Sequence, residues 1–203
     1  MRILILTIAL LYSASSFAQI NWTEGWDAEV LKNAKVTGST KMSKVEMDVI
    51  FYCNLARLKP KKFLATIVPK YISSRELKSS GYISSLKRDL KKTKKLTAFK
   101  ISDNLYEVAN IHAISSGKKG TIGHQNYSKR FKKVETEFGT NGENCDYGNS
   151  KAIDIVFSWL IDEGISSLGH RKNILDKEYN HTAVSIADHK KYEVNAVMTF
   201  GKK

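Results

Sequence analysis

The sequence contains little cysteine and little proline, with two residues of each among 203. So few cysteines exclude a disulfide-dense scaffold and a zinc fold built on paired cysteines, and so few prolines exclude a collagen-like chain. With 42% hydrophobic and 10% aromatic residues, the chain still has enough apolar material for a packed core. Composition therefore describes a globular protein of one large domain or two small ones.

Acidic residues are also scarce relative to basic ones. Thirty-three Lys and Arg against 20 Asp and Glu give a net charge of +13. The most basic segment is residues 87–100, which carries one acid, Asp89, and the basic residues Lys87, Arg88, Lys91, Lys92, Lys94, Lys95 and Lys100. Two interpretations stay open: a patch that binds an anionic envelope or extracellular polymer, and an ordinary solvated surface.

The N-terminus has the features of a secretory signal peptide. Arg2 supplies the positive charge, residues 3–12 form an apolar run, and Ser16 and Ala18 are small residues at the −3 and −1 positions. The alternative, a membrane anchor, needs roughly 20 apolar residues. We therefore expect cleavage after Ala18 and export of a soluble monomer to the periplasm or the medium, with no transmembrane segment and no specific nucleic-acid partner.

Export changes the interpretation of the two cysteines. Cys53 and Cys145 form an even pair in an oxidising compartment, so a disulfide between them is the first hypothesis. Two buried free thiols are the alternative, because free cysteine behaves as a small hydrophobic residue.

Residues 19–42 show little periodicity and are expected to form an N-terminal arm, followed by one domain over residues 43–203. Ser43 and Glu46 have the spacing of a helix capping box. Proline at position 60 is expected to end or kink this first helix, and Pro69 to break its continuation. A second helix should begin at residue 102 or 103 and end at the glycines from Gly117 onward.

A third helix is predicted over residues 150–160, and alternating apolar residues predict a C-terminal β-hairpin over residues 183–187 and 192–200. Helices come first and strands come late, which indicates an α+β fold rather than repeated βαβ units.

No short motif names an activity, because GxSxG, HExxH, Walker and GxGxxG patterns are all missing. A longer pattern is more informative. In chain order it comprises Asn54-Leu55-Ala56-Arg57, Pro60, Ala109-x-x-His112, Gly123-His124, Gly142-Glu143-Asn144, Trp159-Leu160 and Gly169-His170-Arg171-x-Asn173-Ile174-Leu175. From about residue 45 to residue 200, the chain resembles the CAP superfamily of cysteine-rich secretory, antigen 5 and pathogenesis-related 1 proteins, in its shorter bacterial SCP-like extracellular form.

This resemblance implies an α-β-α sandwich with a cleft lined by two histidines and two acids. By motif, His124 and His170 match the histidines, and Glu143 matches the first acid. The second acid is expected three residues after the tryptophan, at Asp162, with Glu163 beside it.

Two imidazoles with carboxylates are ligands that zinc or another divalent metal accepts, so His124 and His170 are candidate metal ligands. A cleft that binds a small molecule or lipid with its four side chains is an equal alternative, and without metal the acids would raise the pKa of the histidines. Two further interpretations stay open: a structural polar cluster, and a hydrolase in which Glu143 acts as general base.

Other polar residues are assigned to structure. His112 and Trp159 are expected in the core, His181 and His189 at the surface, and Arg57 partly exposed.

Overall fold

A computed structural model describes residues 20–38 and 41–203, so the predicted signal peptide and its cleavage site lie outside the described residues. The helices are α1 (Ala28–Ala34), α2 (Lys44–Leu58), α3 (Pro60–Ser74), α4 (Gly81–Lys92), α5 (Asp103–Lys119), α6 (Tyr127–Phe131), α7 (Ala152–Ile161) and α8 (Gly169–Leu175). The strands are β1 (Lys100–Ile101), β2 (Thr140–Tyr147), β3 (His181–His189) and β4 (Glu193–Lys202).

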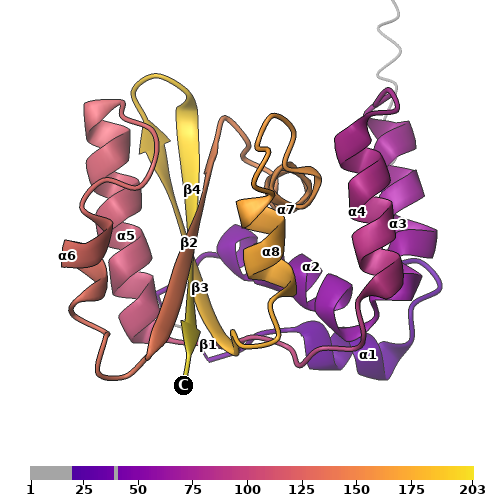
Figure 1. Cartoon of the computed structure of the whole chain (residues 1–203), viewed down its shortest axis with the longest axis horizontal. Helices are drawn as coiled ribbons and strands as arrows, with labels where there is room; N and C mark the ends of the chain where they lie inside the picture. Colours follow the sequence, from indigo (N-terminus) through magenta and orange to yellow (C-terminus); the bar gives the residue numbers. More distant parts are fainter. Residues whose placement is uncertain (1–19, 39–40) are drawn as a thin grey trace, which may run out of the picture.

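The four strands form one sheet in the order β1-β3-β4-β2. β1 runs parallel to β3, and the other pairs are antiparallel. Figure 1 shows the sheet nearly edge-on, with α5 and α6 on one face and α2, α7 and α8 on the other, while α3 and α4 pack beyond α7. The predicted α+β class, the α-β-α sandwich and the C-terminal β-hairpin are confirmed.

The predicted capping box begins α2. Ser43 accepts a hydrogen bond from the backbone N–H of Glu46, and the Glu46 carboxylate accepts one from the backbone N–H of Ser43. Glu46 is itself buried and also accepts a bond of 2.7 Å from the backbone N–H of Ile186. One side chain therefore both caps α2 and fixes it against β3.

The expected break at Pro69 does not occur, and α5 ends at the second of the glycines expected to end it rather than the first. α3 continues through Pro69, because buried side chains on either side of it, including Phe63 and Tyr71, hold the helix against the core. α5 continues through Gly117 and ends at Gly120, whose φ of 67° gives a left-handed C-cap. Gly117 instead lets the β3–β4 turn approach, since a Cβ there would lie 2.0 Å from the carbonyl oxygen of Asp188.

The predicted disulfide is wrong, because both cysteines are free and buried. Cys53 lies on α2 in the main core. Cys145 lies on β2 and packs with Ala109 and Val197 beneath α5. These two helices cover opposite faces of the sheet, so the sheet separates the two thiols (Figure 1).

Two further expectations of exposure are wrong. Arg57 is fully buried, and its guanidinium donates hydrogen bonds to four backbone carbonyls between Thr97 and Tyr179. His189 is 2% exposed and lies 3.1 Å from the carbonyl of Thr121, because the hairpin turn folds onto the end of α5. His112 and Trp159 are buried as predicted.

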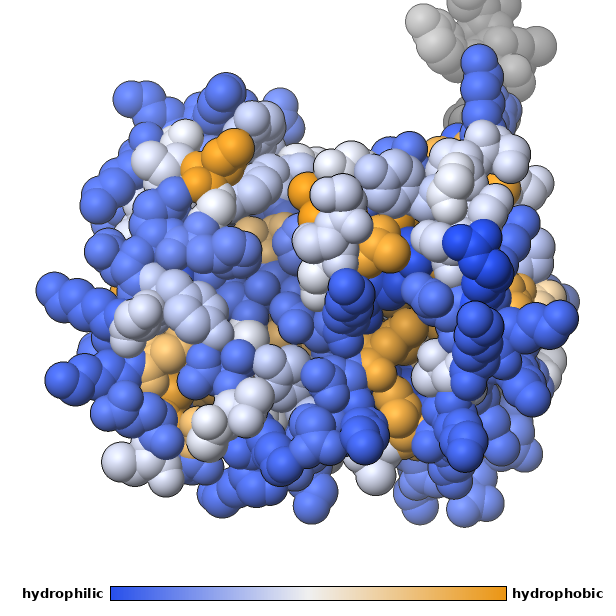
Figure 2. All heavy atoms as spheres, viewed as in Figure 1, coloured by the Kyte–Doolittle hydropathy of each residue, from blue (hydrophilic) through white to orange (hydrophobic). Residues whose placement is uncertain are grey.

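The lysine-rich segment forms an exposed face. Along α4, Ile83, Leu86 and Leu90 are buried, while the basic residues of the predicted patch are exposed. Figure 2 shows this outer face of α4 as a hydrophilic surface. None of the helices in the described part of the chain combines the length and apolarity needed to cross a membrane.

Candidate functional site

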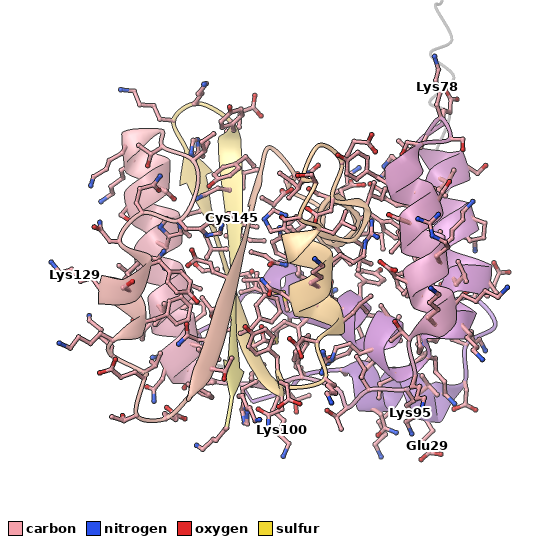
Figure 3. All side chains as sticks on the ribbon, in the orientation of Figure 1. Glu29, Lys78, Lys95, Lys100, Lys129 and Cys145 are labelled. Carbon is pink, nitrogen blue, oxygen red and sulfur yellow. The ribbon has the colours of Figure 1, made fainter. Side chains whose placement is uncertain are left out.

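β2 organises the candidate site because it is an edge strand whose side chains alternate between two helical layers. Glu143 and Cys145 face the layer of α5 and α6, where their neighbours are His112 and Arg130. Asn144 and Asp146 face the opposite layer, where α7 and α8 lie. Figure 3 shows Cys145 on β2 between these two layers.

The first predicted pair meets on the α5–α6 side. His124 Nδ1 lies 2.8 Å from Glu143 Oε1, in a hydrogen bond that the ring nitrogen donates to the carboxylate. The Glu143 side chain has no exposed surface, whereas 46% of the His124 side chain is exposed. Glu143 therefore orients the ring, and Nε2 is the nitrogen left for a ligand.

Sequence reasoning missed Arg130, which binds the same carboxylate through both of its terminal nitrogens. Asn126 adopts a left-handed conformation with φ of 55° and starts α6, which turns Arg130 inward while its neighbour Lys129 points to solvent (Figure 3). Burial raises the pKa of Glu143, but the hydrogen bonds from His124 and Arg130 outweigh it and hold that pKa below its usual value. A carboxylate with both oxygens engaged and a lowered pKa is a weak general base.

The second predicted pair lies on the α7–α8 side. His170 Nδ1 is 2.7 Å from Asp162 Oδ1, and the backbone N–H groups of His170 and Arg171 donate to Asp162 Oδ2. Asp162 ends α7 in a left-handed conformation with φ of 60°, which directs its carboxylate to the first turn of α8. Its side chain is fully buried, and 21% of the His170 side chain is exposed. Again the acid orients the ring and leaves Nε2 available.

An amide bridge connects the two sides. Asn144 is fully buried on β2 and donates to the backbone carbonyl of His170 at 3.0 Å. Asn173 on α8 donates in turn to the side-chain oxygen of Asn144 at 2.8 Å. Both asparagines belong to the motifs identified in the sequence, and they fix α8 against β2 immediately beside Glu143.

A third histidine lies near Glu143. His112 Nε2 is 2.8 Å from the carbonyl oxygen of Gly123, to which it donates, and 3.8 Å from Glu143 Oε1. Burial lowers the pKa of His112. Ligand atoms of His112, Glu143 and Cys145 all lie within 4.8 Å of one another, and this buried group could hold a metal ion.

A groove of about 760 Å³ lies on the α7–α8 side and reaches β2 at Cys145. Its walls are mostly apolar, including Ile83, Phe157 and Ile165, and its polar residues include Asp162 and His170. Figure 2 shows apolar side chains in the hollow between α4 and the α7–α8 segment.

One further acid, Asp146, faces this groove. Burial raises the pKa of Asp146 to about 6, although Ser158 and Asn149 donate hydrogen bonds to it. Unlike Glu143, it has no cationic side chain bound to its carboxylate among the described residues.

All four predicted site residues therefore flank β2, as two histidine–acid pairs rather than one mixed cluster. A model of the cysteine-rich secretory protein family, CAP, matches residues 52–200. The chain belongs to the CAP family. No curated protein matches the sequence.

Solved structures similar to this CAP chain come from three bacteria. An outer surface protein of Borrelia burgdorferi is 22% identical with a TM-score of 0.46, over 60% of this chain and 89% of that one. An SCP-domain extracellular protein of Bacillus anthracis is 20% identical (TM-score 0.45), and a cysteine-rich secretory protein of Staphylococcus aureus is 18% identical (TM-score 0.41). Each match covers 60% of this chain but only 37% and 36% of those two proteins, about a third of their length.

Proposed function

We propose that this CAP-domain protein binds a small ligand or divalent metal, zinc being the first candidate, through the Nε2 atoms of His124 and His170. One observation carries the proposal: each ring gives its Nδ1 to a fully buried carboxylate at 2.7–2.8 Å, while part of the imidazole side chain stays exposed. This is the arrangement by which outer carboxylates orient histidine ligands and raise their basicity.

The chemistry of the donors fits such an ion. Neutral imidazole nitrogen suits zinc, which in sites open to ligands keeps a position for water or a small molecule. Glu143 and Asp162 act as the orienting partners in this proposal, because their oxygens are already engaged. The apolar groove next to His170 suits the hydrophobic part of a small molecule or lipid.

A hydrolase in which Glu143 acts as general base is less well supported. Arg130 neutralises Glu143 and occupies both oxygens, so a water molecule would compete with a buried ion pair for that carboxylate.

Calorimetric titration of metal-stripped protein with Zn²⁺ tests the proposal. We expect wild type to bind one ion and the double variant His124→Ala/His170→Ala to lose binding. His181→Ala is the matched control, since this half-buried histidine lies at the start of β3, away from both pairs. Absent binding by wild type, or equal binding by the double variant, would remove the metal proposal.

We also propose export of the mature chain, supported by the charge, apolar run and small residues of positions 1–18. N-terminal sequencing of protein recovered from the periplasm or medium should begin at Gln19. Recovery in the cytoplasm with Met1 intact would contradict export.

A further inference from the structure

The outer edge of β2 is covered along only part of its length. In the sheet order β1-β3-β4-β2 this strand pairs with β4 alone, so alternate residues turn their backbone N–H and C=O groups away from the sheet. Gly148 donates from its backbone N–H to the carbonyl of Val194, and the register with β4 is regular from Thr140 to Tyr147. The even-numbered residues of β2 therefore face β4, and the odd-numbered residues face outward.

Side chains cover the first half of this outward edge. Tyr179 Oη donates to the backbone carbonyl of Asn141 at 2.9 Å, and Asn173 Nδ2 donates to the backbone carbonyl of Glu143 at 3.5 Å. Both carbonyls belong to odd-numbered residues, as the register requires. This half of the edge is therefore closed to another strand.

The second half of the edge, at Cys145 and Tyr147, is open. Among the residues that the structure describes, none is hydrogen-bonded to the outward backbone groups of these two. Both residues line the groove of about 760 Å³, although their side chains lie on the α5–α6 side, where Cys145 Sγ is near His124 and Tyr147 Oη accepts from the N–H of Gly123. They therefore present backbone to the groove, and unpaired groups on a strand edge are a template for a further strand.

The walls of the groove suit the side chains of such a strand. Ile122 in the loop after α5 and Ile165 in the loop after α7 line the groove and are 53% and 41% exposed. Phe157 and Ile161 of α7 form a buried part of the wall. Successive side chains of an extended peptide point to opposite sides, so an added strand meets apolar surface on both.

Charge decides which kind of peptide fits. The chain has a net charge of +13, yet the groove is lined by four acids and one lysine, namely Asp146, Asp154, Asp162, Glu163 and Lys78. Arg75 binds Asp154, and His170 binds Asp162. Asp146 and Glu163 form no ion pair with any described residue, and their hydrogen-bond donors are neutral side chains. The groove is therefore complementary to a basic peptide rather than an acidic one.

We propose that this groove binds an extended peptide with apolar and basic side chains, which adds as a strand to the open edge of β2. The main chain of the peptide pairs with Cys145 and Tyr147, its apolar side chains contact the α7 wall and Ile122, and a basic side chain reaches Asp146 or Glu163. The peptide occupies the cleft of the proposed function, on which this assignment rests, but strand pairing itself requires no metal.

Fluorescence anisotropy of metal-stripped protein with the labelled peptide Lys-Val-Val-Lys-Val-Val-Lys tests this assignment. We expect one peptide to bind per chain, and the version with glutamate in place of each lysine to bind at least about 10-fold more weakly. Methylating the backbone nitrogens on one edge of the peptide leaves the other edge for β2 and should be tolerated. Methylating the nitrogens on both edges should weaken binding by about 10-fold or more, since it removes the peptide's main-chain donors.

Three results of this titration would overturn the assignment. The first is no binding of the parent peptide, and the second is equal binding of the version methylated on both edges. The third is binding of dodecanoate without binding of the peptide, which would give the groove to a lipid.

Hydrogen exchange locates the peptide without any variant of the protein. The backbone amide hydrogens of Cys145 and Tyr147 should exchange more slowly in the complex than in the free protein, because each gains an acceptor. Unchanged exchange at both amides in the saturated complex would overturn strand pairing.

Asp146→Asn tests the basic side chain, because it removes the charge and keeps the size of the acid. This variant should bind the lysine peptide about 10-fold more weakly and lose much of the preference over the glutamate peptide. Asp188→Asn, at the exposed end of β3, is the matched control and should bind like wild type. An unchanged preference in Asp146→Asn would overturn the assignment of a basic peptide to this acid.

Zinc titration and peptide binding separate the two proposals. Peptide binding by a protein that binds no Zn²⁺ supports strand pairing and removes only the metal. Zn²⁺ binding by a protein that binds no peptide overturns strand pairing and leaves the metal proposal standing.

Discussion

The histidine–acid pairs on the two sides of β2 are held in place by different interactions. On the α5–α6 side, Glu143 is held by Arg130, a side chain that reaches it only through the tertiary fold. On the α7–α8 side, Asp162 is eight residues from His170 and uses backbone N–H groups of α8. One imidazole is thus oriented by a buried ion pair and the other by a local chain reversal, so the two should differ in sensitivity to substitution and pH.

The largest effect is expected from removing the cation. Arg130→Ala leaves the Glu143 carboxylate buried without its cationic partner, which should lower the free energy of unfolding by about 3–5 kcal/mol at neutral pH. Urea unfolding of the variant and of Lys129→Ala, the exposed neighbour, measures this. The control should stay within about 0.5 kcal/mol of wild type.

The same variant has a defined pH dependence. The lowered pKa of Glu143 stabilises the wild-type fold above the usual value of 4.5, and this contribution disappears as the pH falls through the lowered pKa. The difference in free energy of unfolding between wild type and Arg130→Ala should therefore become smaller in acid. A difference that is constant with pH would show that the ion pair is not its cause.

Asp162→Ala should lower the free energy of unfolding by a smaller amount, about 2 kcal/mol. The substitution removes hydrogen bonds to the first turn of α8 but leaves no buried charge without a partner. Asp162→Asn is the matched comparison, since asparagine tolerates the left-handed conformation and keeps one acceptor. Thermal unfolding should give the highest melting temperature for wild type, a lower one for Asp162→Asn and the lowest for Asp162→Ala. An alanine variant as stable as the asparagine variant would contradict the capping role.

Asp146 should show the opposite pH dependence to Glu143. Its pKa is raised from 3.8 to about 6, so the folded state binds a proton that the unfolded state has lost, and wild-type stability falls as the pH rises between these values. Asp146→Asn should be more stable than wild type by about 1–2 kcal/mol at pH 8 and should lose this advantage near pH 4. Denaturant unfolding at both pH values decides it, and an advantage that persists at the lower pH would contradict the assignment.

The smallest structural effect is expected from the exposed lysines at the end of α4 and just after it. Changing Lys91, Lys92, Lys94 and Lys95 to Gln should leave stability and Zn²⁺ binding unchanged. If this face binds anionic polymer, retention on an anionic glycan or lipid support should weaken and wild-type retention should fall with added salt. Unchanged retention would leave the charge as a solvated surface.

Local signals in the sequence predicted much of the fold. The capping residues Ser43 and Ser102 mark the starts of α2 and α5, because caps act within one turn of the chain. Alternation predicted the β3–β4 hairpin. The predicted helix break at Pro69 is wrong because tertiary packing on both sides of it outweighs the local cost of a proline in a helix.

The site was predictable only in part. The motifs identified both histidines and both acids, yet Arg130 has no distinguishing signal among neighbouring lysines, and its role depends on the left-handed turn at Asn126. Cys145 contacts Glu143 because side chains two residues apart in a strand lie on the same face. This contact could be predicted only if residues 140–147 were already known to form a strand. The disulfide is absent because the two cysteines lie on opposite faces of the sheet. The sequence could not show this, since a separation of 92 positions (145 − 53) does not indicate which face each cysteine occupies.

We propose that His124 and His170, oriented from opposite sides of β2, act on one ligand. A crystal structure of the protein loaded with Zn²⁺, with anomalous data at the zinc edge, tests it most directly. We expect one anomalous peak within bonding distance of both Nε2 atoms, with both Nδ1 atoms still bound to Glu143 and Asp162. A peak bound to one of these imidazoles alone, or no peak at either, would contradict it.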